Sequence, residues 1–441
     1  MSGLLRICTA GSVDDGKSTL IGRLLYDSRA VYEDQLASVE KASKNRVAGP
    51  IDFSLFTDGL KAEREQGITI DVAYRYFATA KRKFILADTP GHEQYTRNMA
   101  TGASTADVAV LLVDARNGVR TQSRRHAKIA RLLGINDFVL AINKMDLVNF
   151  DRQVFDGIVD DFEDLLRGSN YHPIPISALD GDNVITNSER TPWFDGKPLL
   201  SFLESVEVDR NATGKPFRFP VQIVLRPDQN FRGFAGQIAS GIIKPGDTVT
   251  ALPSGRTSKV KRIVTWDGDL EMAHAPMSVT LTLEDEIDIS RGDVLSADTQ
   301  PLAMSYQPSV EKKFEAEVVW MDERPLDPAR VYLLKQGTRI VSAEVNRGLV
   351  LNQIGTVTVT ATRPIVFDKY TDNRFTGSFI LIDPGTNFTA GAGMITSAVH
   401  DRGTSAAKPS AAERLAQIAR AATTETEAIE AVRLALEEIL K

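Results

Sequence analysis

A nine-residue stretch near the N-terminus, Gly11-Ser12-Val13-Asp14-Asp15-Gly16-Lys17-Ser18-Thr19, most constrains what this chain can fold into. It has the form G-x-x-x-x-G-K-S/T, with an apolar run before it and a helical pattern of Leu and Ile after it. This strand–loop–helix context is the one that a phosphate-binding loop needs. We expect backbone N–H groups of the loop to face phosphate oxygens, Lys17 to contact the β- and γ-phosphates, and Ser18 to bind Mg²⁺.

The next two hundred residues alternate strand and helix patterns, which predicts an α/β domain with a mostly parallel sheet. Ligand loops of such sheets lie at the carboxyl ends of the strands. The predicted strands are Leu4–Ala10, Lys83–Ala87, Val108–Val113, Phe138–Asn143 and Pro173–Ile176, and the clearest predicted helices are Ser123–Leu133 and Arg152–Arg167.

Two motifs indicate which residues would meet the γ-phosphate of a bound nucleotide. Asp88-Thr89-Pro90-Gly91-His92 directly follows a predicted buried strand, so Asp88 would hold a water on Mg²⁺ and the Gly91 N–H would meet the γ-phosphate. His92 would then orient the attacking water. The stretch up to Gly67 is rich in charge; it is either a solvated helix face or a segment that orders on nucleotide, and Thr69 after it favours the second, reaching Mg²⁺ and the γ-phosphate.

A third motif, Asn143-Lys144-Met145-Asp146, predicts guanine specificity. The Asp146 carboxylate would accept hydrogen bonds from N1–H and the 2-amino group of guanine, a donor pair that adenine lacks. Asn143 would tie this loop to the phosphate loop, and the Lys144 stem would cover the base. Backbone N–H groups of Ser177-Ala178-Leu179 would lie near guanine O6.

From these motifs we predict His92, Thr69 and Lys17 as catalytic residues, and Ser18, Thr69 and Asp88 as metal ligands. The other histidines, His126, His172, His274 and His400, have no such context, and we assign them no function. The predicted GTP-binding residues are Gly11, Ser12, Val13, Asp14, Asp15, Gly16, Lys17, Ser18, Thr19, Asp88, Thr89, Pro90, Gly91, His92, Asn143, Lys144, Met145, Asp146, Ser177, Ala178 and Leu179.

Beyond a predicted linker at 209–215 the pattern changes to short β runs with Gly, Pro and Asp turns, which predicts two all-β barrels. The predicted strands of the first include Val221–Leu225, Gln237–Ile243, Asp247–Ala251 and Ser278–Leu283. The tail carries an apolar helical stripe that either packs on its own chain or docks a partner. We expect four regions: a GTP-binding domain at 1–210, barrels at 216–298 and 308–400, and a short helical tail at 401–441.

Composition limits the class of protein. A run of about 18 apolar residues is absent from the sequence, so we expect no membrane span. The N-terminus leads straight into a predicted core strand, which argues against a signal peptide. The single cysteine, Cys8, would be a small buried hydrophobe. We therefore expect a cytoplasmic protein, and the net charge of −6 gives no indication of a nucleic-acid partner.

Together these motifs resemble the translation-factor GTPases of the elongation factor Tu and elongation factor 1-alpha type, over about residues 1–400. Arg232–Asp247 is similar to the second domain of that family, and Arg374–Ile380 to part of the third. Three stretches more closely resemble the large GTPase subunit of bacterial heterodimeric sulfate adenylyltransferase (ATP sulfurylase). They are Gly11–Ser28, Ala62–Phe77 and Asp88–Ser104.

The sequence departs from the translation factors at Ser12, where they usually have histidine, and in the Asp14-Asp15 pair. The resemblance to the sulfate enzyme implies a subunit that hydrolyses GTP with Mg²⁺ while a separate small subunit makes adenosine 5′-phosphosulfate from ATP and sulfate. It also matches Val13 and Ile68 to the apolar pair that flanks the catalytic histidine. A second G-x-x-x-x-G-K-S/T is absent, so we expect no fused adenylylsulfate kinase activity in these residues.

Two alternatives remain at this point. The chain could be an elongation factor that delivers aminoacyl-tRNA, or a nucleotide-sensing regulator without coupled chemistry. His92 and Thr69 argue against the regulator, because a pure sensor need not position an attacking water. No adenylyl-transfer site is visible in the sequence, and we assign none.

Overall fold

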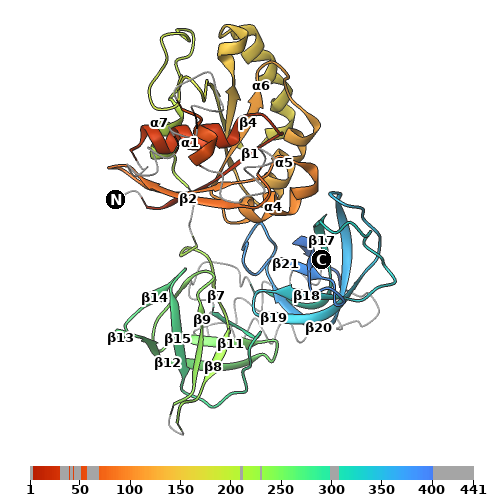
Figure 1. The fold of residues 1–441 in the computed structure, drawn as a ribbon. Coiled ribbons are helices and arrows are strands. Elements are labelled where there is room, and N and C mark those ends of the chain that lie inside the picture. The colour runs from red at the N-terminus through yellow and green to blue at the C-terminus, as the bar shows by residue number, and fades with distance from the viewer. Residues whose placement is uncertain are drawn as a thin grey trace, which may run out of the picture. The chain divides into compact units, whose positions relative to one another are not determined.

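The computed structural model describes residues 3–29, 39, 43, 51–56, 69–208, 212–228, 231–297 and 307–400 (Figure 1). The charged lead before Thr69, Ile68 and the predicted tail helix lie outside these residues. None of the helices in the described part of the chain combines the length and the apolar content needed to span a bilayer. The predicted domain boundaries stay predictions.

The first part of the chain is a six-stranded sheet of order β2-β3-β1-β4-β5-β6, in which only β2 runs antiparallel to its neighbour. The strands are β1 (Leu5–Gly11), β2 (Ala73–Ala78), β3 (Lys83–Asp88), β4 (Val108–Asp114), β5 (Asp137–Asn143) and β6 (Asn170–Pro175). The mostly parallel sheet expected from the sequence is confirmed, with strand ends shifted by at most three residues. The edge strand β2 was not predicted.

Helices and short 3-10 turns connect these strands. The helices are α1 (Lys17–Asp27), α4 (Thr96–Ser104), α5 (Thr121–Leu132), α6 (Arg152–Leu166) and α7 (Leu199–Ser205), and the 3-10 turns are η1 (Phe53–Phe56), η2 (Glu93–Tyr95) and η3 (Met145–Val148). The helix α6 begins at a capped end, because Asp151 accepts a hydrogen bond from the backbone N–H of Gln153 at 2.7 Å.

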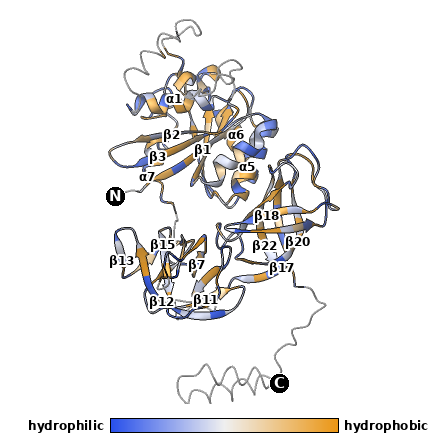
Figure 2. Cartoon of the chain, turned by 60° about the horizontal axis from the view of Figure 1, so that its bottom comes forward, coloured by the Kyte–Doolittle hydropathy of each residue, from blue (hydrophilic) through white to orange (hydrophobic). Residues whose placement is uncertain are grey.

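Strand β4 shows why the sheet is covered on both faces. Its alternate residues Val108, Val110 and Leu112 pack in a cluster with residues of α1 and α7. The intervening residues Ala109, Leu111 and Val113 pack with residues of α4, α5 and α6 on the other face. A strand buried on both faces is continuously apolar, which is typical of parallel sheets. Figure 2 shows that the neighbouring strand β1 is also largely hydrophobic, whereas α6 has hydrophilic residues as well.

The middle of the chain forms an antiparallel sheet of eight strands, in the order β7-β16-β11-β12-β15-β9-β8 with β13 paired to β12. A bridge between Arg218 and Ser240 connects β7 to the residues just after β9, so the sheet curls. The strands are β7 (Phe217–Pro220), β8 (Ile223–Leu225), β9 (Gly233–Gln237), β11 (Thr248–Leu252), β12 (Arg256–Thr265), β13 (Gly268–Leu270), β15 (Ser278–Leu283) and β16 (Val294–Ala297), with a separate pair of β10 (Ile242–Ile243) and β14 (Ala273–His274).

The predicted strand Gln237–Ile243 is wrong. The chain leaves the sheet after Gln237, and Gly241 has a φ of 82°, a conformation that glycine adopts without strain. The chain then forms the short strand β10, which pairs with β14 in a separate two-stranded sheet.

The last described part is a closed six-stranded barrel of order β17-β20-β19-β18-β21-β22. Its strands are β17 (Ser309–Trp320), β18 (Tyr332–Gln336), β19 (Arg339–Val345), β20 (Ile354–Phe367), β21 (Ser378–Ile382) and β22 (Thr389–Ala398). The fold class expected from the sequence is thereby confirmed: an α/β GTPase-like domain followed by all-β units.

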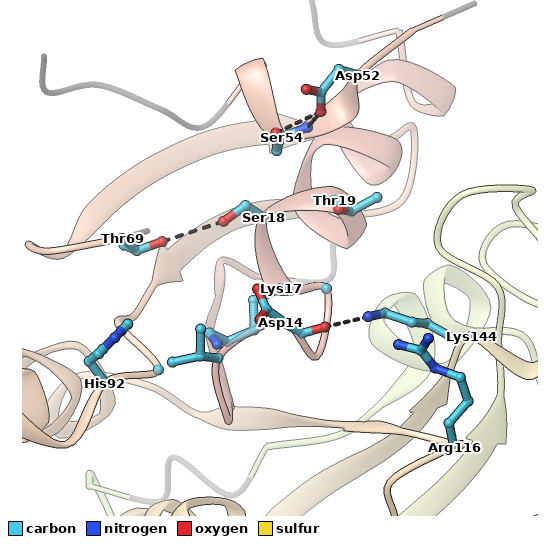
Figure 3. A pocket seen from close by; sticks show the side chains of 13 residues that line it. Asp14, Lys17, Ser18, Thr19, Asp52, Ser54, Thr69, His92, Arg116 and Lys144 are labelled. Carbon is cyan, nitrogen blue, oxygen red and sulfur yellow. Dashed lines mark hydrogen bonds between the residues drawn. The ribbon is translucent and has the colours of Figure 1, made fainter. Parts of the chain in front are cut away.

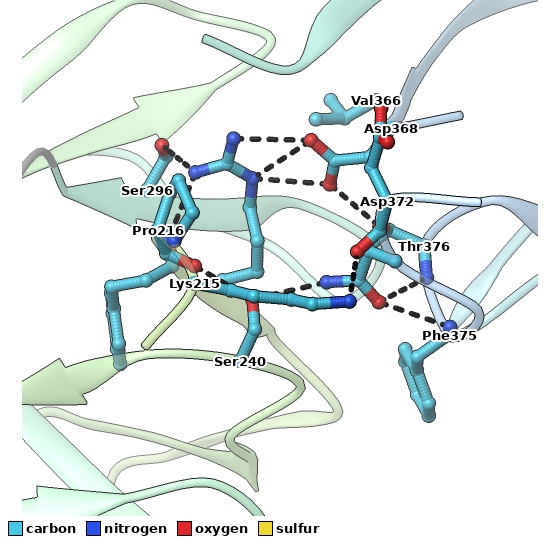
Figure 4. Close-up of polar contacts among 12 residues, drawn as sticks. Lys215, Pro216, Ser240, Ser296, Val366, Asp368, Asp372, Phe375 and Thr376 are labelled. Carbon is cyan, nitrogen blue, oxygen red and sulfur yellow. Dashed lines mark hydrogen bonds and ion pairs between the residues drawn. The ribbon is translucent and has the colours of Figure 1, made fainter. Parts of the chain in front are cut away.

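A buried ion pair connects the eight-stranded sheet to the barrel (Figure 4). Arg218 on β7 and Asp368 after β20 have side chains that are 1% and 3% exposed. The guanidinium donates to both carboxylate oxygens at 3.1–3.3 Å and to Ser296 Oγ at 3.0 Å. The hydroxyl of Thr376 donates to Asp368 Oδ2 at 2.6 Å. Because each charge is satisfied by several partners, removal of one leaves the other buried and uncompensated.

We expect Asp368→Ala to reduce the free energy of unfolding by about 3–5 kcal/mol, because it leaves the buried Arg218 guanidinium without its counter-ion. Urea denaturation followed by circular dichroism measures this. The pair Arg262–Asp269 is a matched control, since its side chains are 50% and 45% exposed, and Asp269→Ala should change stability far less. Equal effects of the two substitutions would contradict the importance of burial.

Candidate functional site

The carboxyl ends of β1, β3, β4 and β5 surround a cavity of about 620 Å³. Residues from the phosphate loop and from the loops after β3, β4 and β5 line it, so segments more than a hundred residues apart meet there. The lining residues are Val13, Asp14, Gly16, Lys17, Ser18, Thr19, Asp52, Ser54, Thr69, Gly91, His92, Arg116 and Lys144. Figure 3 shows their arrangement.

Two glycines allow this close approach of backbones. Gly16, which precedes α1, has a φ of 93°, and a Cβ there would lie 2.4 Å from Asn143 Nδ2. A Cβ on Gly91 would lie 2.6 Å from Lys17 Nζ and 2.8 Å from the backbone nitrogen of Val13. Any larger residue at either position would push the neighbouring loop out of place.

Lys17 lies buried at the start of α1. Its ammonium donates to the carbonyls of Gly11 at 3.2 Å and Ser12 at 2.7 Å, so the loop fixes the position of the charge. Burial lowers the pKa of Lys17, while the carboxylates of Asp88, Asp15 and Asp14 oppose that shift. A cation held at the N-terminal end of a helix is suited to bind phosphate oxygens.

Three oxygen-bearing side chains predicted to hold a metal lie together. Ser18 Oγ donates to Asp88 Oδ2 at 3.2 Å and lies 3.4 Å from Thr69 Oγ1. Two hydroxyls and one carboxylate are hard oxygen donors of the kind that Mg²⁺ prefers. In the described residues, no group of three or more His, Cys, Asp or Glu side chains forms a complete metal site. A Mg²⁺ ion here would therefore depend on nucleotide phosphates for further ligands.

His92 lies at the opposite end of the cavity from Lys144 and Arg116 (Figure 3). It immediately precedes η2, and its ring meets that of Tyr95 edge-on, with centroids 6.2 Å apart. Thr69 lies toward the same end in Figure 3, and Gly91, which also lines the cavity, directly precedes His92 in the chain. The assignment of this end to the γ-phosphate stays a prediction. Val13 lines the cavity, while its predicted apolar companion Ile68 falls outside the described residues.

Asn143 connects the loops expected to hold guanine and phosphate. Its Nδ2 donates to the carbonyl of Asp15 at 2.8 Å, and its Oδ1 accepts from the backbone N–H of Ala178 at 2.9 Å. The Lys144 Nζ donates to the carbonyl of Asp14 at 2.5 Å, so the lysine stem crosses from one loop to the other. The contact of Asn143 with the phosphate loop is the one expected from the sequence, whereas the contact of Lys144 with Asp14 was not predicted. The expected place of the Lys144 stem over the base stays a prediction.

The other residues predicted to contact guanine are Met145, Asp146 and Ser177–Leu179, and some of their hydrogen-bonding groups already have partners within the protein. Met145 is buried, and Asp146 follows it on η3. Two of the three N–H groups expected near guanine O6 donate elsewhere: Ser177 to the carbonyl of Asp182 at 3.3 Å, and Ala178 to Asn143. The Leu179 side chain is exposed, and its carbonyl accepts from Arg23 at 2.9 Å.

Sequence reasoning missed four residues that line or support the cavity: Asp52, Ser54, Asp114 and Arg116. Asp114 ends β4 and receives hydrogen bonds from Arg116 Nε at 3.0 Å and Nη2 at 2.7 Å. Burial alone would raise the pKa of Asp114, but hydrogen bonds from Arg116 and Lys144 outweigh burial and hold the pKa well below its usual range. For Asp114 the available signal was an acidic residue directly after the predicted buried strand Val108–Val113.

His126 also supports the phosphate loop, although we assigned it no function from the sequence. It lies on α5 and is fully buried, and its Nδ1 accepts a hydrogen bond from the backbone N–H of Gly11 at 3.2 Å. On the same helix, Ser123 Oγ lies 3.0 Å from Ser12 Oγ. The serine that departs from the translation-factor pattern thus contacts α5. Burial, with smaller effects of Lys17 and Arg125, lowers the pKa of His126 to about 3.

We expect the free energy of unfolding to fall as the pH drops from about 7 to about 4. Below its ordinary pKa of about 6.5 the unfolded histidine takes up a proton that the folded His126 cannot. In His126→Gln this part of the slope should be lost. Denaturant unfolding at several pH values measures it, with His274→Gln as the control on an exposed histidine. An unchanged slope in His126→Gln would disprove the burial of a neutral ring.

Comparison with known proteins agrees with this geometry. Residues 2–209 match the family described as the elongation factor Tu GTP binding domain, and residues 346–396 match the GTP-eEF1A C-terminal domain-like family. The chain is 54% identical to sulfate adenylyltransferase subunit 1 of Bacteroides thetaiotaomicron over 423 residues, which cover 89% of this chain and 86% of that protein. It is 54% identical to the proteins of the same name from Tolumonas auensis (90% and 87% covered) and Shewanella oneidensis (90% and 86%). The chain therefore belongs to the sulfate adenylyltransferase subunit 1 family, within the elongation factor Tu-like GTPases.

Proposed function

We propose that this chain is the GTP-hydrolysing subunit of a sulfate adenylyltransferase. Hydrolysis of GTP here would help drive the synthesis of adenosine 5′-phosphosulfate from ATP and sulfate on a separate small subunit. The observation that carries this proposal is the 54% identity to subunit 1 proteins, together with a GTP-binding domain in which some residues of each motif, among them Lys17, His92 and Lys144, line one cavity. The name subunit 1 implies a partner subunit, and the small catalytic subunit is the partner that we propose.

The roles proposed for the site residues follow from their positions along the cavity, with Lys144 toward one end and His92 toward the other (Figure 3). Lys17 would bind the β- and γ-phosphates, and Asn143, Lys144 and Asp146 would hold guanine. Ser18, Thr69 and Asp88 would hold Mg²⁺, which when bound neutralises charge on the phosphates. His92 would position the attacking water beside the γ-phosphate, because it lines the cavity on the same side as Thr69 (Figure 3).

The direct test of the function is GTP turnover by the purified 441-residue chain, with and without a sulfurylase small subunit plus ATP and sulfate. We expect the partner and its substrates to stimulate turnover, with adenylylsulfate formed in proportion to the GTP hydrolysed. The chain resembles elongation factors in fold, so ribosomes with aminoacyl-tRNA are the necessary comparison. Stimulation by ribosomes and tRNA, without any response to the small subunit, would overturn the proposal.

We expect His92→Ala to keep its affinity for GTP and to hydrolyse it at least about 100-fold more slowly, because the attacking water loses its positioning group. Single-turnover hydrolysis of bound GTP measures this. His274→Ala, on the short strand β14 outside the cavity lining, is the control and should hydrolyse at the wild-type rate. Rapid hydrolysis by His92→Ala would remove His92 from the mechanism.

A further inference from the structure

We propose that Arg116 is a nucleotide-binding residue that contacts the ribose and α-phosphate portion of bound GTP and GDP. This inference rests on the proposed function only in taking a guanine nucleotide as the ligand of the cavity. Arg116 belongs to no motif identified in the sequence. Its assignment comes from the strand order, from its place in the cavity and from its charge.

The strand order places Arg116 between two sites that sequence motifs mark. In the sheet, β4 lies between β1, which leads into the phosphate loop, and β5, which leads into the guanine loop. The strand β3, which leads to Gly91 and His92, lies on the other side of β1. The chemical order of the nucleotide is γ-, β- and α-phosphate, ribose, base. A side chain that follows β4 therefore meets the ribose and α-phosphate.

The geometry of the cavity agrees with this position. Arg116 lines it together with Gly16 and Lys144, and Figure 3 shows the guanidinium close to the Lys144 side chain, with His92 at the far end. The buried Asp114 holds both cations: its Oδ2 lies 2.7 Å from Arg116 Nη2 and 3.0 Å from Lys144 Nζ. The guanidinium is thus fixed before any ligand binds, which reduces the entropy that binding would cost.

The charges favour an anionic ligand. One carboxylate, Asp114, is shared by two cations, so these three side chains together carry one net positive charge at the wall of the cavity, and the Asp146 carboxylate acts on Arg116 from farther away. The Arg116 side chain is 47% exposed, whereas that of Asp114 is only 2% exposed, so the cation faces the cavity and the carboxylate supports it from behind. A planar guanidinium in this position suits both phosphate oxygens and ribose hydroxyls.

This placement distinguishes Arg116 from an arginine that acts on the γ-phosphate during hydrolysis. Such an arginine stabilises charge in the transition state, and its loss lowers the rate of hydrolysis. Because Arg116 lies at the end of the cavity opposite His92, its loss should weaken the binding of GTP and GDP alike (Figure 3). The hydrolysis rate of bound GTP should stay near that of the wild type.

The test uses the full chain with Arg116→Ala and measures affinity for fluorescent GDP and for a non-hydrolysable GTP analogue, together with single-turnover hydrolysis at saturating GTP. We expect about tenfold weaker binding of both nucleotides, because one charge-assisted contact is lost. The hydrolysis rate should stay within about twofold of wild type. Arg167→Ala is the matched control. Arg167 is a 78% exposed arginine at the C-terminal end of α6 that pairs with Asp164 and does not line the cavity, so its loss should leave affinity unchanged.

Arg116→Gln removes the charge but keeps much of the side-chain length, and it should show the same loss of affinity at an unchanged melting temperature. Wild-type affinity in both Arg116 variants would overturn the inference. A slower hydrolysis rate with unchanged affinity would overturn it too, since that result belongs to a γ-phosphate role. Failure of the wild-type chain to bind guanine nucleotide would overturn this inference and the proposed function together, whereas normal binding without response to a small subunit would overturn only the coupling.

Discussion

The buried side-chain amide of Asn143 is the interaction on which the geometry of the site most depends. One end of the amide donates to the phosphate loop at Asp15, and the other accepts from Ala178 in the loop after β6. Asn143 is 2% exposed, so loss of either hydrogen bond would leave a polar group unsatisfied in the protein interior. Through this one residue, three loops from separate parts of the chain keep a common arrangement.

The sequence predicted the parts of the fold that depend on local pattern. Continuous apolar runs identified β1, β3, β4 and β5, because both faces of these strands are buried. The edge strand β2 was missed since its residues alternate between partly buried and exposed, and Tyr76 is 69% exposed. The predicted strand through Ile238 and Gly241 was wrong because a glycine turn interrupts it, which an apolar pattern does not show.

The site residues also differ in whether a local sequence pattern identifies them. Lys17 and Ser18 could be named from sequence because their spacing on one strand–loop–helix unit carries the chemistry. Asp88 could be named because it directly follows a predicted buried strand. His126 and Arg116 could not, because their contacts depend on which strands are neighbours. His126 reaches Gly11 across 115 residues, and Arg116 becomes meaningful only when β4 is seen to lie between β1 and β5. Strand order in a sheet is a property of the assembled core and not of any local pattern.

The net charge of the chain and that of the side chains lining the cavity differ in sign. The chain as a whole carries a formal charge of −6, which by itself suggests no affinity for an anion. Yet three cations, Lys17, Arg116 and Lys144, line one cavity and are held there by backbone carbonyls and a buried carboxylate. Net charge governs long-range attraction, whereas a polyanionic nucleotide responds to the field inside the cavity, where low-dielectric walls strengthen it. The selectivity of this site for a nucleotide therefore depends on where a few charges are fixed, and the net charge of the chain does not predict it.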